Sequence, residues 1–108
     1  SPAIGLIETL LAHGVQVRLY DPVANPALIE FFAGNAGIIN CLSAYQAVEE
    51  SDALMLVTEW KEFWNLDLYD IANTMRTPLL LDGRNIYDPE YAQQAGLTYS
   101  GIGRGMRI

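Results

Sequence analysis

The sequence has few cationic residues and no long apolar run, and both shortages exclude classes of partner. Six lysines and arginines stand against thirteen aspartates and glutamates, which gives a formal net charge of −7. Nucleic acids and anionic membrane surfaces are bound by clustered positive charge, so we expect neither as a partner. A single phosphate group needs only one or two placed cations and some backbone N–H groups, and is not excluded. No apolar stretch approaches the roughly 20 residues of a membrane span.

Cysteine and histidine are equally scarce. The single Cys41 cannot form an internal disulfide bond, which favours a reducing, cytoplasmic location. Together with His13, the one histidine, it makes no recognisable metal site and no nucleophile–base pair. The start, Ser1-Pro2-Ala3, lacks the basic segment of a signal peptide. We therefore expect a cytoplasmic domain that carries no metal and no catalytic residue.

What the sequence does contain is enough apolar material for a core. Hydrophobic residues make up 51% and charged residues 18% of a chain of 108 residues, which fits one domain spanning residues 1–108. Helices are expected where capping residues or prolines open apolar-periodic segments, at residues 1–14, 25–34, 43–50, within 63–75 and at 88–96. Strands are expected at the apolar, β-branched runs 15–20, 38–42, 53–57, 78–81 and 97–102.

This alternation predicts an α/β fold: a Rossmann-like three-layer sandwich with a mostly parallel sheet and helices on both faces. The series begins with a helix, whereas such sheets normally begin with a strand, so the first strand is expected to be missing. In the strand order 3-2-1-4-5-6 that strand lies between segments 15–20 and 53–57. Those two segments could then pair directly, take a strand from another copy, or keep exposed edges. We favour self-association.

Polar residues recur at the predicted carboxyl ends of the strands, where ligands bind in open parallel sheets. They are Asp21, residues 58–60, residues 82–85 and residues 103–104. Arg84 is the foremost candidate, because it follows Gly83, which lets the backbone approach a ligand, and because a guanidinium grips a phosphate with two hydrogen bonds. The alternative is a surface arginine paired with Asp82 or Asp88.

The other candidates have plain structural alternatives. Trp60, with Phe63 and Trp64 close behind, has the ring to stack on a base, but a core or interface role is favoured. Glu59 either accepts hydrogen bonds from sugar hydroxyls or caps the next helix. Asp21 is placed like an acid that binds a dinucleotide ribose, but a turn-forming Asp-Pro is the commoner explanation.

Several segments carry a resemblance to a known family. They are the opening Ser1-Pro2-Ala3, residues 17–22, Thr58-Glu59-Trp60 with Phe63, residues 75–78 leading into Asp82-Gly83-Arg84-Asn85, and Tyr99 with residues 101–105. Over essentially the whole chain they resemble the UDP-binding C-terminal domain of the UDP-glucose and GDP-mannose dehydrogenases. Within the family, Thr-Glu-Trp followed by Asp-Gly-Arg-Asn is most similar to bacterial UDP-glucose 6-dehydrogenases.

The resemblance implies an enzyme of polysaccharide biosynthesis that oxidises the C6 alcohol of UDP-glucose to a carboxylate in two NAD-dependent steps. It implies that the catalytic Cys and most of the NAD site belong to an N-terminal half outside this chain, so Cys41 is not given that role. Residues 101–105 are no substitute, because they follow the last strand and open no helix. By resemblance Arg84 is a substrate contact, with Gly83 and Asn85 beside it and Glu59 and Trp60 near the site. A homo-oligomer is expected.

Two readings from other classes stay open. One is a free-standing nucleotide-binding or regulatory α/β module without catalysis. The other is a domain whose main role is subunit assembly, through the aromatic segment 60–64.

Overall fold

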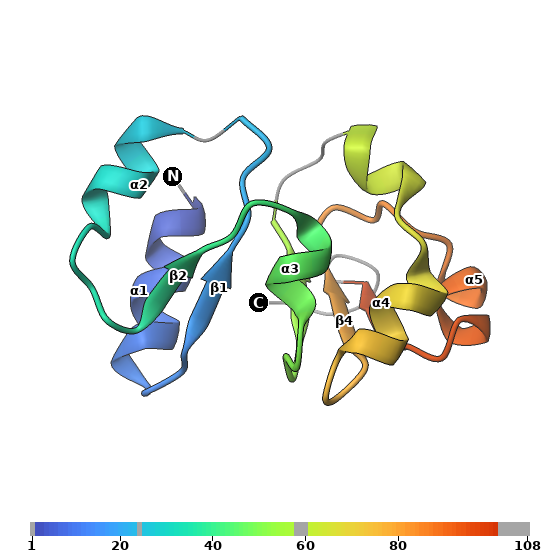
Figure 1. Cartoon of the computed structure of the whole chain (residues 1–108). Coiled ribbons are helices and arrows are strands. Elements are labelled where there is room, and N and C mark those ends of the chain that lie inside the picture. Colours follow the sequence, from blue (N-terminus) through green and yellow to red (C-terminus); the bar gives the residue numbers. More distant parts are fainter. Residues whose placement is uncertain (1, 24, 58–60, 102–108) are drawn as a thin grey trace. The chain divides into compact units, whose positions relative to one another are not determined.

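The computed structural model describes residues 2–23, 25–57 and 61–101 (Figure 1). Helices and strands alternate along them, and all strand pairs are parallel. The chain divides into two compact units, residues 1–47 and 48–108, each with its own sheet. The Glu59 and Trp60 of the predicted site lie outside the described residues.

The first unit has a two-stranded sheet, β1-β2, in which Val17 pairs with Ile38 and Leu19 with Asn40. Its elements are α1 (Pro2–Ala12), β1 (Val17–Leu19), α2 (Pro26–Phe31), β2 (Ile38–Asn40) and the start of α3 (Ala44–Val48). Their buried core is formed by Ile7, Phe32 and Ile38, one each from α1, the end of α2 and β2. The segment boundaries follow from local signals, since Asn25 accepts the N–H of Ala27 at the start of α2.

The structure gives a local reason for two residues of this unit, Gly14 and Arg18. Gly14 has φ +77°, a left-handed conformation that ends α1 while its N–H donates to the carbonyl of Leu11. Arg18 is a charged residue in an otherwise apolar strand. Its guanidinium donates to the carbonyl oxygens of Gln46 (2.8 Å) and Ala47 (3.2 Å), so it ties β1 to carbonyl groups of α3.

The second unit has a three-stranded parallel sheet in the order β3-β4-β5. Its elements are β3 (Leu54–Leu56), the 3-10 helix η1 (Lys61–Asn65), α4 (Leu68–Thr74), β4 (Leu79–Asp82), α5 (Pro89–Gln94) and β5 (Thr98–Gly101). Leu68, Ile71, Leu80 and Ala92 are fully buried and form the centre of this unit. The helix α4 confirms the one expected within residues 63–75, and Asp67 starts it by accepting the N–H groups of Tyr69 and Asp70.

The α/β class with parallel strands is confirmed, but the strands form two sheets rather than one continuous sheet. One sheet pairs β1 with β2, and the other has the order β3-β4-β5. Direct pairing of β1 with β3 is absent from the described residues. Each of these strands therefore has one hydrogen-bonded neighbour.

The register of the strand pairs shows which backbone groups of β1 and β3 face away from their one hydrogen-bonded neighbour. In a parallel ladder every second residue of a strand bonds to a given neighbour. Val17 and Leu19 bond to the β2 side, and Leu56 accepts from Gly83 beyond β4. The peptide groups of Arg18 and Met55 therefore face away from these neighbours. Leu54 and Met55 are only partly buried and Val57 is exposed, as befits an edge strand.

Candidate functional site

The strands β3, β4 and β5 are parallel neighbours, so their carboxyl ends meet at one edge of the second sheet. Gly83, Arg84 and Asn85 follow β4 at this edge, and the N–H of Gly83 donates to the carbonyl oxygen of Leu56, the last residue of β3 (2.9 Å). The structure thus brings three of the five predicted site residues together on one loop. Asp21 belongs to the other unit.

Asp82, the last residue of β4, holds this loop in place. Its side chain is 0% exposed, and among the residues that the structure describes Asp82 alone is charged or polar and buried. Its Oδ1 accepts the N–H of Arg84 (3.1 Å), and its Oδ2 accepts the N–H of Tyr87 (2.9 Å). The hydroxyl of Tyr99, on β5, donates to the same Oδ2 (2.9 Å). One carboxylate therefore joins the end of β4, both ends of the following loop and the neighbouring strand.

The network extends from this carboxylate through Tyr87. The ring of Tyr87 is buried, and its hydroxyl donates to the carbonyl oxygen of Phe63 in η1. The Tyr99 hydroxyl also lies 3.2 Å from the carbonyl oxygen of Tyr87. Phe63 itself is buried, in agreement with the core interpretation of this aromatic, whereas Trp64 is 59% exposed. Hydrogen bonds therefore connect η1, β4 and β5 of the second unit with the loop that carries Arg84.

Gly83 has a structural reason for being glycine that differs from the one inferred from the sequence. A Cβ at this position would lie 2.8 Å from the carbonyl oxygen of Leu56, closer than real Cβ contacts come. The close approach is thus between two segments of the protein's own backbone. Asn85 has φ +55°, the left-handed region that asparagine tolerates better than most residues.

The side chain of Arg84 is exposed, and the alternative pairing with Asp82 does not hold. Asp82 accepts from the backbone N–H of Arg84, not from its guanidinium, and is buried. Among the described residues, Arg76 forms an ion pair with Asp52 (3.3 Å), and Arg84 forms none. Its guanidinium therefore has no ionic partner among the described residues.

The structure also shows the surroundings of Asp21, Cys41 and His13. Asp21 accepts the N–H groups of Val23 and Asn25, which is the geometry of a turn-forming aspartate. Cys41 is a buried free thiol. His13 follows α1, and its Nδ1 lies 2.9 Å from the carbonyl oxygen of Thr9.

Metal-binding clusters and membrane-spanning helices are absent from the described residues. They contain no group of three or more His, Cys, Asp or Glu side chains placed to hold a metal ion. No helix within residues 2–23, 25–57 and 61–101 is long and apolar enough to cross a membrane.

The sequence did not reveal that Asp82 is buried and accepts three hydrogen bonds. An aspartate at the end of an apolar strand reads as a solvent-facing residue. The contact with Tyr99 follows from the pairing of β4 with β5, since Tyr99 lies two residues before Gly101, the β5 partner of Asp82. That relation requires the strand register, which the sequence alone does not supply.

The parallel strands and the helices between them define a Rossmann-type α/β domain. Residues 1–89 match the UDP binding domain of the UDP-glucose/GDP-mannose dehydrogenase family. The chain belongs to this family and corresponds to that domain.

Individual relatives agree with this assignment. The chain is 47% identical to the UDP-glucose 6-dehydrogenase of Pseudomonas aeruginosa over 107 residues, which cover 96% of the chain and 24% of the relative. It is 39% identical to the UDP-glucose 6-dehydrogenase of Rhizobium meliloti over 105 residues, covering 96% of the chain and 23% of the relative. The chain thus spans about a quarter of the length of these relatives.

A solved structure shares the fold. The UDP-D-ManNAc dehydrogenase of Pyrococcus horikoshii superimposes with a TM-score of 0.57 at 24% identity, over 93% of this chain and 29% of that one.

Proposed function

We propose that this domain binds the UDP moiety of a nucleotide sugar at the carboxyl ends of β3 and β4, and that Arg84 contacts a phosphate. The observation that carries the proposal is an exposed arginine without a described ionic partner, on a loop whose backbone is held by Asp82. Gly83 and Asn85 shape this loop. Glu59 and Trp60 follow β3 in the sequence and complete the proposed site.

The domain is proposed to be part of an NAD-dependent UDP-glucose 6-dehydrogenase that forms UDP-glucuronate for polysaccharide biosynthesis. The names of the two bacterial relatives support this activity. In this proposal the enzyme works in the cytoplasm as a homo-oligomer. NAD is held mainly by the part of the enzyme outside this chain, because the chain contains no G-x-G-x-x-G segment to cradle a pyrophosphate. The residues present here do not fit a dinucleotide site.

The test is Arg84→Ala in the complete enzyme, with binding of UDP measured by calorimetry and the KM for UDP-glucose measured by NADH formation. A hydrogen bond to a charged group contributes about 1.5–3 kcal/mol, so affinity should fall roughly ten- to hundredfold. Arg76→Ala is the matched control, since Arg76 is exposed in the same unit but already paired with Asp52. Unchanged affinity in Arg84→Ala would contradict the proposed contact.

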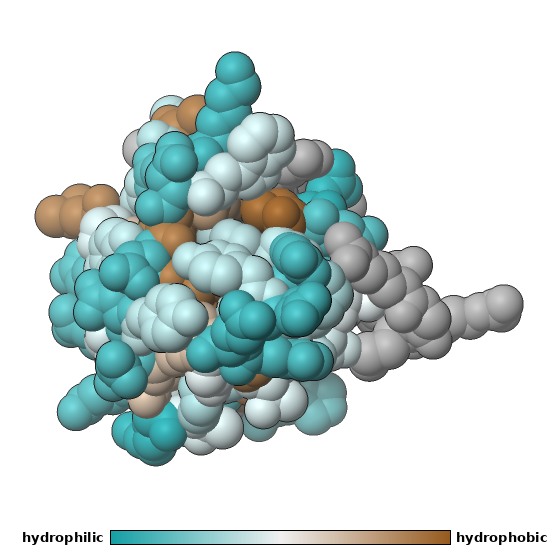
Figure 2. Space-filling view, turned by 90° about the vertical axis from the view of Figure 1, so that its right-hand side faces the viewer, coloured by the Kyte–Doolittle hydropathy of each residue, from teal (hydrophilic) through white to brown (hydrophobic). Residues whose placement is uncertain are grey.

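Subunit assembly is a second candidate role, because the second unit exposes several large aromatic side chains. Trp64, Tyr69 and Tyr91 are at least 40% exposed. The face seen in Figure 2 is mostly hydrophilic or intermediate in hydropathy, with apolar residues in small separate areas. Sedimentation of the complete enzyme with Trp64→Ser tests this role. If Trp64→Ser dissociates the enzyme into smaller species that keep their UDP affinity, the result would support assembly through the surface that contains Trp64.

A further inference from the structure

We propose that Asp82 is a positioning residue for nucleotide binding, acting through the backbone of Arg84, and that Tyr99 couples this carboxylate to the next strand. This inference rests on the proposed contact between Arg84 and a phosphate. It adds two residues, neither of which touches the ligand, that set how well Arg84 binds.

The geometry of the Asp82 carboxylate supports this role. Its two oxygens accept from N–H groups two and five residues further along the chain, those of Arg84 and Tyr87. Both ends of the loop are therefore hydrogen-bonded to the same carboxylate. The loop between them contains Asn85 in a left-handed conformation, which the surrounding structure has to hold in place. The carboxylate is hydrogen-bonded to the backbone on both sides of Asn85.

These hydrogen bonds do more than stabilise the fold. They hold the backbone of Arg84, whose side chain has no described partner of its own. A long, exposed side chain loses rotamer freedom when it binds a ligand. Here the backbone that carries it is already fixed by the hydrogen bond from its N–H to Oδ1. Loosening that bond adds an ordering cost to ligand binding, even where the fold survives.

Tyr99 makes the role testable by a mild change. Its hydroxyl donates to Oδ2, the same oxygen that accepts the N–H of Tyr87, and its ring is only partly buried. Tyr99→Phe removes one donor and keeps the ring in place. Asp82→Asn is the stronger change, because an amide nitrogen would face one of the N–H or O–H donors.

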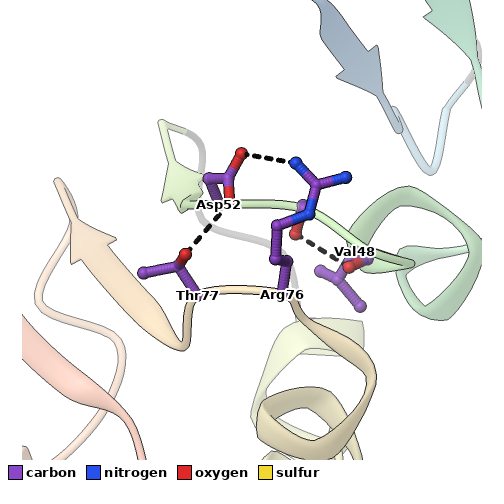
Figure 3. A network of polar contacts seen from close by, with 5 residues as sticks. Val48, Asp52, Arg76 and Thr77 are labelled. Atoms are coloured by element: carbon purple, nitrogen blue, oxygen red, sulfur yellow. Dashed lines mark hydrogen bonds and ion pairs between the residues drawn. The ribbon is translucent and has the colours of Figure 1, made fainter.

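The second unit also offers a matched control carboxylate. Asp52 accepts from the guanidinium of Arg76 (3.3 Å) and the hydroxyl of Thr77 (3.0 Å), as Figure 3 shows. It precedes β3, and Thr77 precedes β4, so this pair lies at the amino ends of the strands. Asp52→Asn thus alters a carboxylate that joins the same two strand segments, away from the loop of Arg84.

The experiment is a double-mutant cycle in the complete enzyme, with UDP as the titrated ligand and kcat and KM for UDP-glucose as a second readout. Tyr99→Phe should weaken UDP binding roughly three- to tenfold, the range of a single hydrogen bond, and Asp82→Asn should weaken it more. KM should rise more than kcat falls. In the Arg84→Ala background neither change should weaken binding further, while Asp52→Asn should leave UDP affinity unchanged in either background.

The outcomes separate this inference from the proposed function. If Arg84→Ala leaves UDP affinity unchanged, the phosphate contact is wrong and the positioning role falls with it. If Arg84→Ala weakens binding but Tyr99→Phe and Asp82→Asn do not, the positioning role alone is wrong. Equal losses with and without Arg84 would also overturn it, because the effect would then not pass through Arg84. Should Asp82→Asn fail to fold, Tyr99→Phe decides.

Discussion

Replacing Gly83 by alanine tests the close approach of the β4 loop to the end of β3. The added Cβ would lie 2.8 Å from the carbonyl oxygen of Leu56, and the N–H of the same residue donates to that oxygen at 2.9 Å. The neighbour is backbone in a hydrogen-bonded strand, so it cannot turn aside as a flexible side chain would. The clash can be relieved only by moving one segment away from the other.

The expected cost follows from three terms. Overpacking against a fixed neighbour costs about 1–3 kcal/mol, and weakening the Gly83–Leu56 hydrogen bond costs up to about 1 kcal/mol. Alanine offsets about 0.4–1 kcal/mol of this by restricting the unfolded chain. We therefore expect a net loss of about 1–3 kcal/mol in the free energy of unfolding. In a domain of this size each kcal/mol lowers Tm by about 4–8 °C.

The assay is urea unfolding of the 108-residue chain, followed by tryptophan fluorescence and by circular dichroism. Both tryptophans, Trp60 and Trp64, belong to residues 48–108, so fluorescence reports on the unit that contains Gly83. Gly5→Ala is the control: Gly5 is exposed in α1, and its added Cβ would meet nothing within 4 Å. That change should raise stability by about 0.5–1 kcal/mol. A Gly83→Ala chain as stable as the unchanged one would refute the close approach.

The remaining predictions concern the helix cap at Asp88, the activity of the chain and its association. Asp88 accepts the N–H of Glu90 at the start of α5, so Asp88→Ala should cost about 1 kcal/mol of stability in urea unfolding, and an unchanged midpoint would contradict the cap. The 108-residue chain alone should form no NADH from UDP-glucose and NAD, and activity that persists in a Cys41→Ser control would disprove this. Because β1 and β3 each have one paired side, we expect the chain to self-associate at micromolar concentration, and a monomer in sedimentation analysis would exclude that.

Much of the fold was predictable because it depends on signals a few residues apart. Asn25 and Asp88 accept N–H groups two residues further on, Ser43 accepts that of Gln46, and Gly14 ends α1 by a left-handed turn. Each of these residues acts within one turn of chain, so its type and neighbours are enough to place a helix boundary. The alternation of such segments fixed the α/β class.

The site depends on contacts that the sequence does not display. Arg84 was predicted as a site residue because a cation after a predicted strand falls at the edge where ligands bind in parallel sheets, and this stays a prediction. The reason given for Gly83 was incomplete, and the part played by Asp82 was missed. Both depend on partners distant in the chain, Leu56 and Tyr99, which come near only when β3, β4 and β5 pair in register. Local residue types decide where a strand ends, but long-range pairing of strands decides which backbone oxygen or hydroxyl that end meets.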